Sequence, residues 1–136
     1  VPLDPSLKRT TMNWAIDPPA IYEAIARIAK RSNGLPIYVT ENGGSFGDVM
    51  GPDGQVHDHD RIALLDGYLA EVARARADGM NVCGYLVWSL LDNFEWAHGY
   101  ERRFGLVHVD YATLKRTPKA SYHWFAQLAR RGVLPG

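Results

Sequence analysis

The chain has 136 residues, 46% of them hydrophobic, so it can form at most one domain with a buried core. Its 15 basic and 15 acidic residues give a formal net charge of zero, which favours neither a nucleic-acid nor an anionic-membrane partner. The single cysteine, Cys83, excludes an internal disulfide, and the most apolar run, 82–91, is about half of the ~20 residues that span a bilayer.

The first part of the chain predicts a helix followed by a strand. Asp17 suits a helix N-cap, and Pro18 suits the first helical position. Asn33 and Gly34 are typical of a helix end. The β-forming residues at 35–40 then predict a short strand, and a glycine-rich loop follows.

The second part predicts another helix, strand and helix. A helix is expected over 58–78, and residues 82–90 predict a strand that is apolar at nearly every position. Such a strand is usually buried on both faces, as in a parallel sheet covered by helices. A long loop over 91–117 has room for a short strand at 106–109, and a last helix is expected to open at Pro118.

The order of these elements predicts an α/β fold with parallel strands and right-handed crossovers. Two parallel strands cannot form a stable sheet alone, because their edges and one apolar face stay uncovered. A closed (β/α)8 barrel needs about 250 residues. We therefore expect the chain to be part of a larger barrel.

Polar and aromatic side chains follow both predicted strands. Glu41 ends the first strand, Trp88 ends the second, and Glu95 and Trp96 lie in the loop beyond. Parallel strands bring these ends to one face, which carries the active site in α/β barrels. Carboxylates beside indole rings suit sugar binding and glycosidic-bond chemistry. By itself, however, a glutamate after a strand is about as often a simple loop cap.

Five motifs together identify a family resemblance. The chain closely resembles glycoside hydrolase family 1, the β-glucosidase family, over essentially its whole length. The matching stretches are WAIDP at 14–18, IYVTENGG at 37–44, VHDHDRIALL at 56–65, GYLVWSLLDNFEWAHGYERRFGLVHVDY at 84–111 and RTPKASYHWF at 116–125.

The resemblance implies both a fold and an activity. The family is a (β/α)8 TIM barrel, and residues 1–136 would be one C-terminal segment of its catalytic domain, about strands seven and eight with flanking helices and no separate domain. The implied activity is that of a retaining β-glucosidase acting on terminal β-D-glucosyl residues, with galactosyl or fucosyl residues also open. The implied setting is carbohydrate metabolism and cellulose degradation, with no cofactor and no metal.

The family's Thr-Glu-Asn-Gly motif assigns the expected nucleophile. Its glutamate corresponds to Glu41, which must be ionised when substrate arrives. The glycines after it would turn the backbone away without crowding the sugar. The neighbouring Asn42 is expected to contribute to substrate binding.

Four further residues are expected to hold the sugar. The resemblance places Trp88 under the sugar ring, Glu95 on the 4- and 6-hydroxyls, and the indole N–H of Trp96 on the 3-hydroxyl. Phe104 corresponds to an aromatic residue that lines the family's pocket. Because an anionic Glu95 would repel phosphate, an unphosphorylated β-glucoside or oligosaccharide is the expected substrate.

The resemblance also shows what the chain lacks. The family's general acid is the glutamate of an Asn-Glu-Pro motif, and no such motif occurs here. The rest of the barrel is therefore required for a complete site, and the chain alone is predicted to be inactive. Two alternatives stay open, namely a non-catalytic sugar-binding relic and a half-barrel that assembles with a separate chain.

The remaining candidates are expected to be structural. Cys83 is predicted to be a small core residue, and His57 and His59 to lie in a solvated loop rather than in a metal site. Trp14 is equally suited to the pocket mouth and to packing. A cytoplasmic location is the default expectation, because the chain has a single cysteine and members of the family are usually bacterial.

Overall fold

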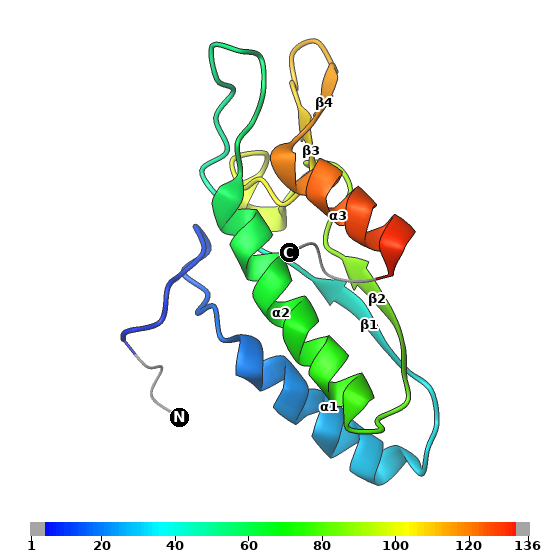
Figure 1. The fold of residues 1–136 in the computed structure, drawn as a ribbon. Helices are drawn as coiled ribbons and strands as arrows, with labels where there is room; N and C mark the ends of the chain where they lie inside the picture. Colours follow the sequence, from blue (N-terminus) through cyan, green and yellow to red (C-terminus); the bar gives the residue numbers. More distant parts are fainter. Residues whose placement is uncertain (1–4, 133–136) are drawn as a thin grey trace.

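The computed structural model describes residues 5–132, in which helices and strands alternate as predicted (Figure 1). The elements, in chain order, are α1 (Pro18–Ser32), β1 (Ile37–Asn42), α2 (His59–Ala77), β2 (Val82–Val87), the 3-10 turn η1 (Trp96–His98), β3 (Val107–Val109), β4 (Arg116–Pro118) and α3 (Ala120–Arg131).

The first helix begins and ends where its sequence predicts. Pro18 occupies the first turn, and the helix ends at Asn33 and Gly34, whose φ angles of 49° and 82° lie in the left-handed region. Asp17 stands at the N-cap position, but its side chain makes no capping hydrogen bond. Its backbone N–H instead donates to the Tyr68 hydroxyl at 3.1 Å, which ties α1 to α2.

The strands β1 and β2 pair in parallel, and helices cover one face of this pair. One buried cluster joins α1 and α2 to both strands, and a second joins α2 to the segment before β3. The first cluster consists of Ile25, Ile37, Val72, Ala75 and Val82, and the second of Leu64, Leu65 and Leu106. Apolar burial of this kind is the main stabilising contribution to such a fold.

The expectation that the second strand is buried on both faces is wrong for the described residues. In β2, Leu86 lies between the core-packed Tyr85 and Val87, yet it is 54% exposed, and Tyr38 on the paired strand β1 is likewise 57% exposed. The cause is that α1, α2 and α3 supply no cover for the opposite face. Cys83 is likewise exposed rather than in the core, because it lies in an open groove between α2, β2 and α3.

The predicted long loop contains an antiparallel hairpin. The short strand expected near residues 106–109 is present as β3, and its partner β4 was not predicted. Because the backbone of 116–118 pairs with β3, α3 opens at Ala120 and not at Pro118. None of the helices within residues 5–132 has the length and apolarity to cross a membrane.

Candidate active site

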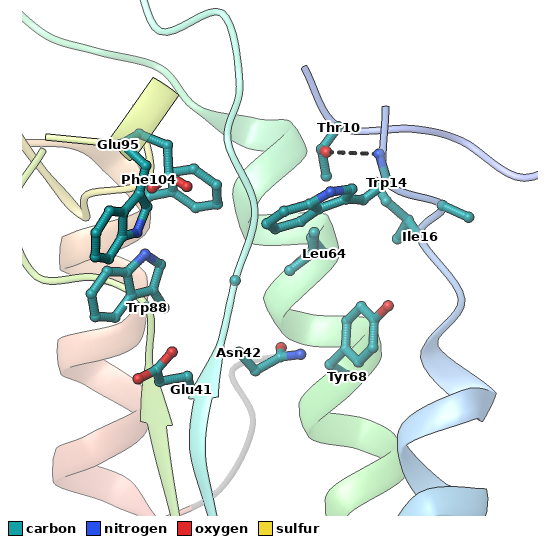
Figure 2. A pocket seen from close by; sticks show the side chains of 13 residues that line it. Thr10, Trp14, Ile16, Glu41, Asn42, Leu64, Tyr68, Trp88, Glu95 and Phe104 are labelled. Atoms are coloured by element: carbon teal, nitrogen blue, oxygen red, sulfur yellow. Dashed lines mark hydrogen bonds between the residues drawn. The ribbon is translucent and has the colours of Figure 1, made fainter. Parts of the chain in front are cut away.

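One pocket of about 550 Å³ lies at the carboxyl ends of β1 and β2, and every predicted site residue lines it (Figure 2). These are Glu41, Asn42, Trp88, Glu95, Trp96 and Phe104. The remaining wall comes from the N-terminal segment, the turn after β1 and α2, namely Thr10, Trp14, Ala15, Ile16, Gly43, Leu64 and Tyr68. The structure thus brings together residues that are up to 63 positions apart among the predicted six.

An irregularity in β1 decides where Glu41 points. Val39 pairs with Tyr85 and Asn42 pairs with Val87, so a step of three residues on β1 faces a step of two on β2. Such a bulge reverses the alternation of the strand. As a result Asn42 points toward α2, and Glu41 points to the other side of the strand, below Trp88 (Figure 2).

Asn42 is held by a neighbouring strand. The Tyr85 hydroxyl donates to Asn42 Oδ1 at 2.6 Å. Burial raises the pKa of Tyr85 far above its ordinary value, with a smaller contribution from Tyr68, so the phenol stays protonated and remains a donor. This bond fixes the amide beside Glu41, and the part of Asn42 in substrate binding stays a prediction.

The two strand ends approach so closely that Gly43 has no space for a side chain. A Cβ atom there would lie 1.9 Å from the carbonyl oxygen of Trp88. The backbone also links the two strands, because Trp88 N–H donates to the Asn42 carbonyl at 2.9 Å. Only glycine allows this contact, which keeps the Glu41 strand end against the Trp88 strand end.

Glu95, Trp96 and Phe104 belong to one closed loop. Its ends meet where Ser89 N–H donates to the Phe104 carbonyl at 3.2 Å and Gly105 N–H donates to Asp92 Oδ1 at 2.9 Å. At its tip, Glu95 N–H donates to the Gly99 carbonyl at 2.6 Å. This places the Glu95 carboxylate in the pocket, whereas the Trp96 ring is 82% exposed.

Trp14 satisfies both roles that its sequence position left open. It lines the pocket, and its ring also packs against Phe104 with 5.7 Å between the ring centroids. Phe104 is buried at 2% exposure beneath it.

A buried network of six charges next to the pocket was not predicted. It connects the loop after β1, the start of α2, the Glu95 loop and the start of α3, and it is balanced, with three anions and three cations. Its members are Asp48, Asp58, Arg61, Asp92, Arg103 and Lys119. The available signal was that all members except Asp48 lie inside the family motifs.

Two members of this network, Asp92 and Lys119, have pKa values shifted by their charged neighbours. Burial alone would raise the pKa of Asp92, but Lys119 and Arg103 hold it below its ordinary value. Burial and the charge of Arg61 lower the pKa of Lys119, while Asp48 and Asp92 oppose that shift. The network therefore depends on pairing every charge, as buried ions require.

The histidines flanking α2 do not form a metal-binding cluster. His57 pairs with the exposed Asp53 at 2.7 Å, and its ring stacks near His59. Within residues 5–132, no group of three or more histidine, cysteine or acidic side chains is arranged to hold a metal ion.

A pocket with two carboxylates and three tryptophans at the carboxyl ends of parallel strands has the position and composition expected of a sugar site in an α/β barrel. The chain belongs to glycosyl hydrolase family 1, whose family model matches residues 2–133.

Known proteins of this family resemble the chain closely. Beta-glucosidase A of Thermotoga maritima is 44% identical over 128 residues, which are 94% of this chain and 29% of that protein. A 6-phospho-beta-galactosidase of Staphylococcus epidermidis is 44% identical over 128 residues, 93% of this chain and 27% of that protein. The solved structure of the Thermotoga maritima family 1 β-glucosidase with isofagomine lactam superposes with a TM-score of 0.95 at 42% identity, covering 98% of this chain and 30% of that one.

The chain therefore spans less than a third of the length of the relatives that it matches. The expectation of part of a (β/α)8 barrel is confirmed. That its strands are the seventh and eighth stays a prediction.

Proposed function

We propose that this chain supplies the nucleophile and the sugar-binding half of a retaining β-glucosidase. The observation that carries the proposal is that all six predicted site residues line one pocket, with Glu41 aimed into it by the bulge in β1. Two of the described pocket residues carry carboxylates, Glu41 and Glu95.

The two carboxylates suit different tasks. Glu41 ends a strand held by Gly43 and Asn42, so its carboxylate has a fixed line of attack on an anomeric carbon above it. Attack would form the Glu41 ester of the glycosyl unit and expel the aglycone, and water would then hydrolyse that ester with net retention. Glu95 lies on a separate loop, from which it can accept hydrogen bonds from sugar hydroxyls.

The general acid is proposed to lie on the remaining part of the barrel. A retaining enzyme needs a second carboxyl group roughly 5–5.5 Å from the nucleophile to protonate the leaving group. Assigning Glu95 to hydroxyl binding leaves that task to a residue outside this chain. The relatives include both a β-glucosidase and a 6-phospho-beta-galactosidase, and the anionic Glu95 favours an unphosphorylated glucoside.

The test is a barrel chimera, in which this chain replaces the matching segment of Thermotoga maritima beta-glucosidase A. We expect it to hydrolyse an aryl β-glucoside and to form a 2-deoxy-2-fluoroglucosyl adduct on the peptide that contains Glu41. Glu41→Gln should reduce kcat by about 10⁴-fold or more without changing the melting temperature, because it removes the nucleophile.

Glu23→Gln is the matched control, since Glu23 is an exposed residue of α1 that pairs only with Arg27 among described side chains. It should leave kcat unchanged. A folded Glu41→Gln chimera that still turns over near the unmodified rate would overturn the nucleophile assignment.

A further inference from the structure

Lys119 has a position that the pocket itself does not explain. It directly precedes α3, is fully buried at 0% exposure, and does not line the pocket. A lysine is rarely buried unless its ammonium group is paired. Here Lys119 Nζ donates to Asp48 Oδ2 at 2.5 Å and to Asp92 Oδ1 at 2.8 Å.

The two carboxylates that Lys119 binds belong to different loops. Asp48 lies in the loop after β1, six residues beyond Asn42 and seven beyond Glu41. Asp92 lies at the base of the loop that carries Glu95. A single ammonium group therefore connects the loop of the proposed nucleophile with the loop of the proposed hydroxyl acceptor.

Further bonds make this connection stiff. Asp48 also pairs with Arg61 at 2.7 Å, and Arg61 donates to the Arg103 carbonyl at 2.8 Å. Arg103 in turn pairs with Asp92 at 2.6 Å. Both carboxylates are thus held by two cations each, and neither can swing away without leaving a buried charge unpaired.

We propose that Lys119 is a positioning residue of the active site, which fixes the separation between the Glu95 loop and the loop after β1 that follows Glu41. The inference rests on the proposed function. A sugar can reach Glu41 with its 4- and 6-hydroxyls on Glu95 only if the two loops keep one spacing, and misplacement by about 1 Å can cost on the order of 100-fold in rate. A lysine suits this task because its compact charge fits between two carboxylates.

The decisive variant is Lys119→Met in the barrel chimera, which keeps an unbranched side chain one atom shorter and removes its charge. We expect KM for an aryl β-galactoside to rise about tenfold, since the loops lose their common anchor. The preference for the galactoside over the fucoside, which is the same sugar without the 6-hydroxyl, should fall several-fold. The reason is that a displaced Glu95 penalises only the sugar that carries that hydroxyl.

Ile25→Ala is the matched control for a loss of stability alone. Ile25 is 2% exposed in the core between α1 and the sheet, far from the charged network in the fold. This variant should lower the melting temperature and leave KM and the galactoside-to-fucoside ratio unchanged. If Lys119→Met behaves in the same way, Lys119 is only a structural residue and the proposal is overturned.

A second variant covers the case in which Lys119→Met does not fold. Asp48→Asn removes one of the two carboxylate charges that Lys119 binds and leaves Lys119 paired with Asp92. KM and the galactoside-to-fucoside ratio should therefore shift in the same direction by a smaller factor. Unchanged values in folded Asp48→Asn would overturn the proposal as well.

Hydrogen exchange separates this inference from the proposed function. If the unmodified chimera folds but does not hydrolyse glycosides, the proposed function fails and the positioning role is still measurable. Amides of residues 43–48 and 93–105 should then exchange faster in Lys119→Met than in Ile25→Ala, because both loops lose one anchor. Equal exchange in the two variants would overturn the positioning role.

Discussion

Gly105 lies where the two ends of the Glu95 loop come together, and it has no room for a side chain. A Cβ atom there would lie 2.1 Å from Asp92 N and 2.4 Å from the Leu91 carbonyl carbon, both backbone atoms that cannot rotate away. We expect Gly105→Ala to destabilise the barrel chimera, in which this and the following urea measurements are made, by about 2–4 kcal/mol, through strain and loss of the Asp92 hydrogen bond.

The matched control is Gly47→Ala, because a Cβ at Gly47 would meet no atom within 4 Å. This substitution should change the free energy of unfolding by less than about 0.5 kcal/mol. Equal stability of the two variants would show that the loop ends do not meet as closely as described.

His108 gives the fold a dependence on pH. It is 9% exposed, and its Nδ1 is buried with no hydrogen-bond partner among residues 5–132. Burial lowers the pKa of His108, Arg103 and Lys119 lower it further, and Asp92 and Asp48 oppose the shift. Below about pH 6.5, His108 therefore binds a proton more readily in the unfolded chain than in the folded chain. The free energy of unfolding is highest above that pH and decreases as the pH falls.

The measurement is the urea midpoint between about pH 7.5 and pH 5.5, above the range in which the aspartates titrate. His108→Leu should flatten the dependence, because leucine binds no proton. His123→Leu, at an exposed position of α3, should retain it. An unchanged slope in His108→Leu would contradict the role of His108.

At the scale of elements, the start of α3 is capped by Asp58, the residue that directly precedes α2. Asp58 stands at the N-cap of α2 but makes no capping bond there. Its carboxylate instead accepts hydrogen bonds from the Ser121 backbone N–H at 2.9 Å and the Ser121 hydroxyl at 2.5 Å, and it pairs with Arg61. One carboxylate thus joins the N-terminal ends of both helices.

We expect Asp58→Ala to cost about 3–5 kcal/mol in urea unfolding, because it removes a partner of the buried Arg61 and the cap of α3. Amides at the start of α3 should lose protection first. Asp17→Ala is the control, since the Asp17 side chain makes no capping bond, and it should cost less than about 0.5 kcal/mol. A small effect of Asp58→Ala would show that α3 is held by packing alone.

The difference between Asp17 and Asp58 illustrates how far the sequence could predict this fold. Local patterns predicted the order of the helices and of β1, β2 and β3, and the turn at Asn33, because these depend on neighbouring residues, but they missed β4. The family motifs identified every residue that lines the pocket from β1 and the Glu95 loop. The bulge in β1 and the partners of Asp58 depend on contacts between distant segments. Local sequence patterns cannot predict such contacts.

At the scale of the whole molecule, the uncovered face of the β1–β2 pair is the dominant feature. Tyr38, Leu86 and Trp88 are 57%, 54% and 38% exposed, and both strands have an unpaired edge within the described chain. In a larger barrel, further strands would cover both the edges and this face. The same surface also fits a half-barrel that assembles with a second chain.

The chain alone should therefore self-associate, since bare strand edges and apolar faces pair with other copies. It should not hydrolyse an aryl β-glucoside, because the proposed general acid lies outside it. Leu86→Lys places a charge on the uncovered face and should shift the light-scattering mass toward that of one chain, 15.2 kDa. Leu114→Lys is the control, because Leu114 is 61% exposed but lies between β3 and β4, away from the β1–β2 pair, and it should leave association unchanged. An unmodified chain that remains monomeric and melts cooperatively would contradict this prediction, because it would show that the two strands are stable without a partner.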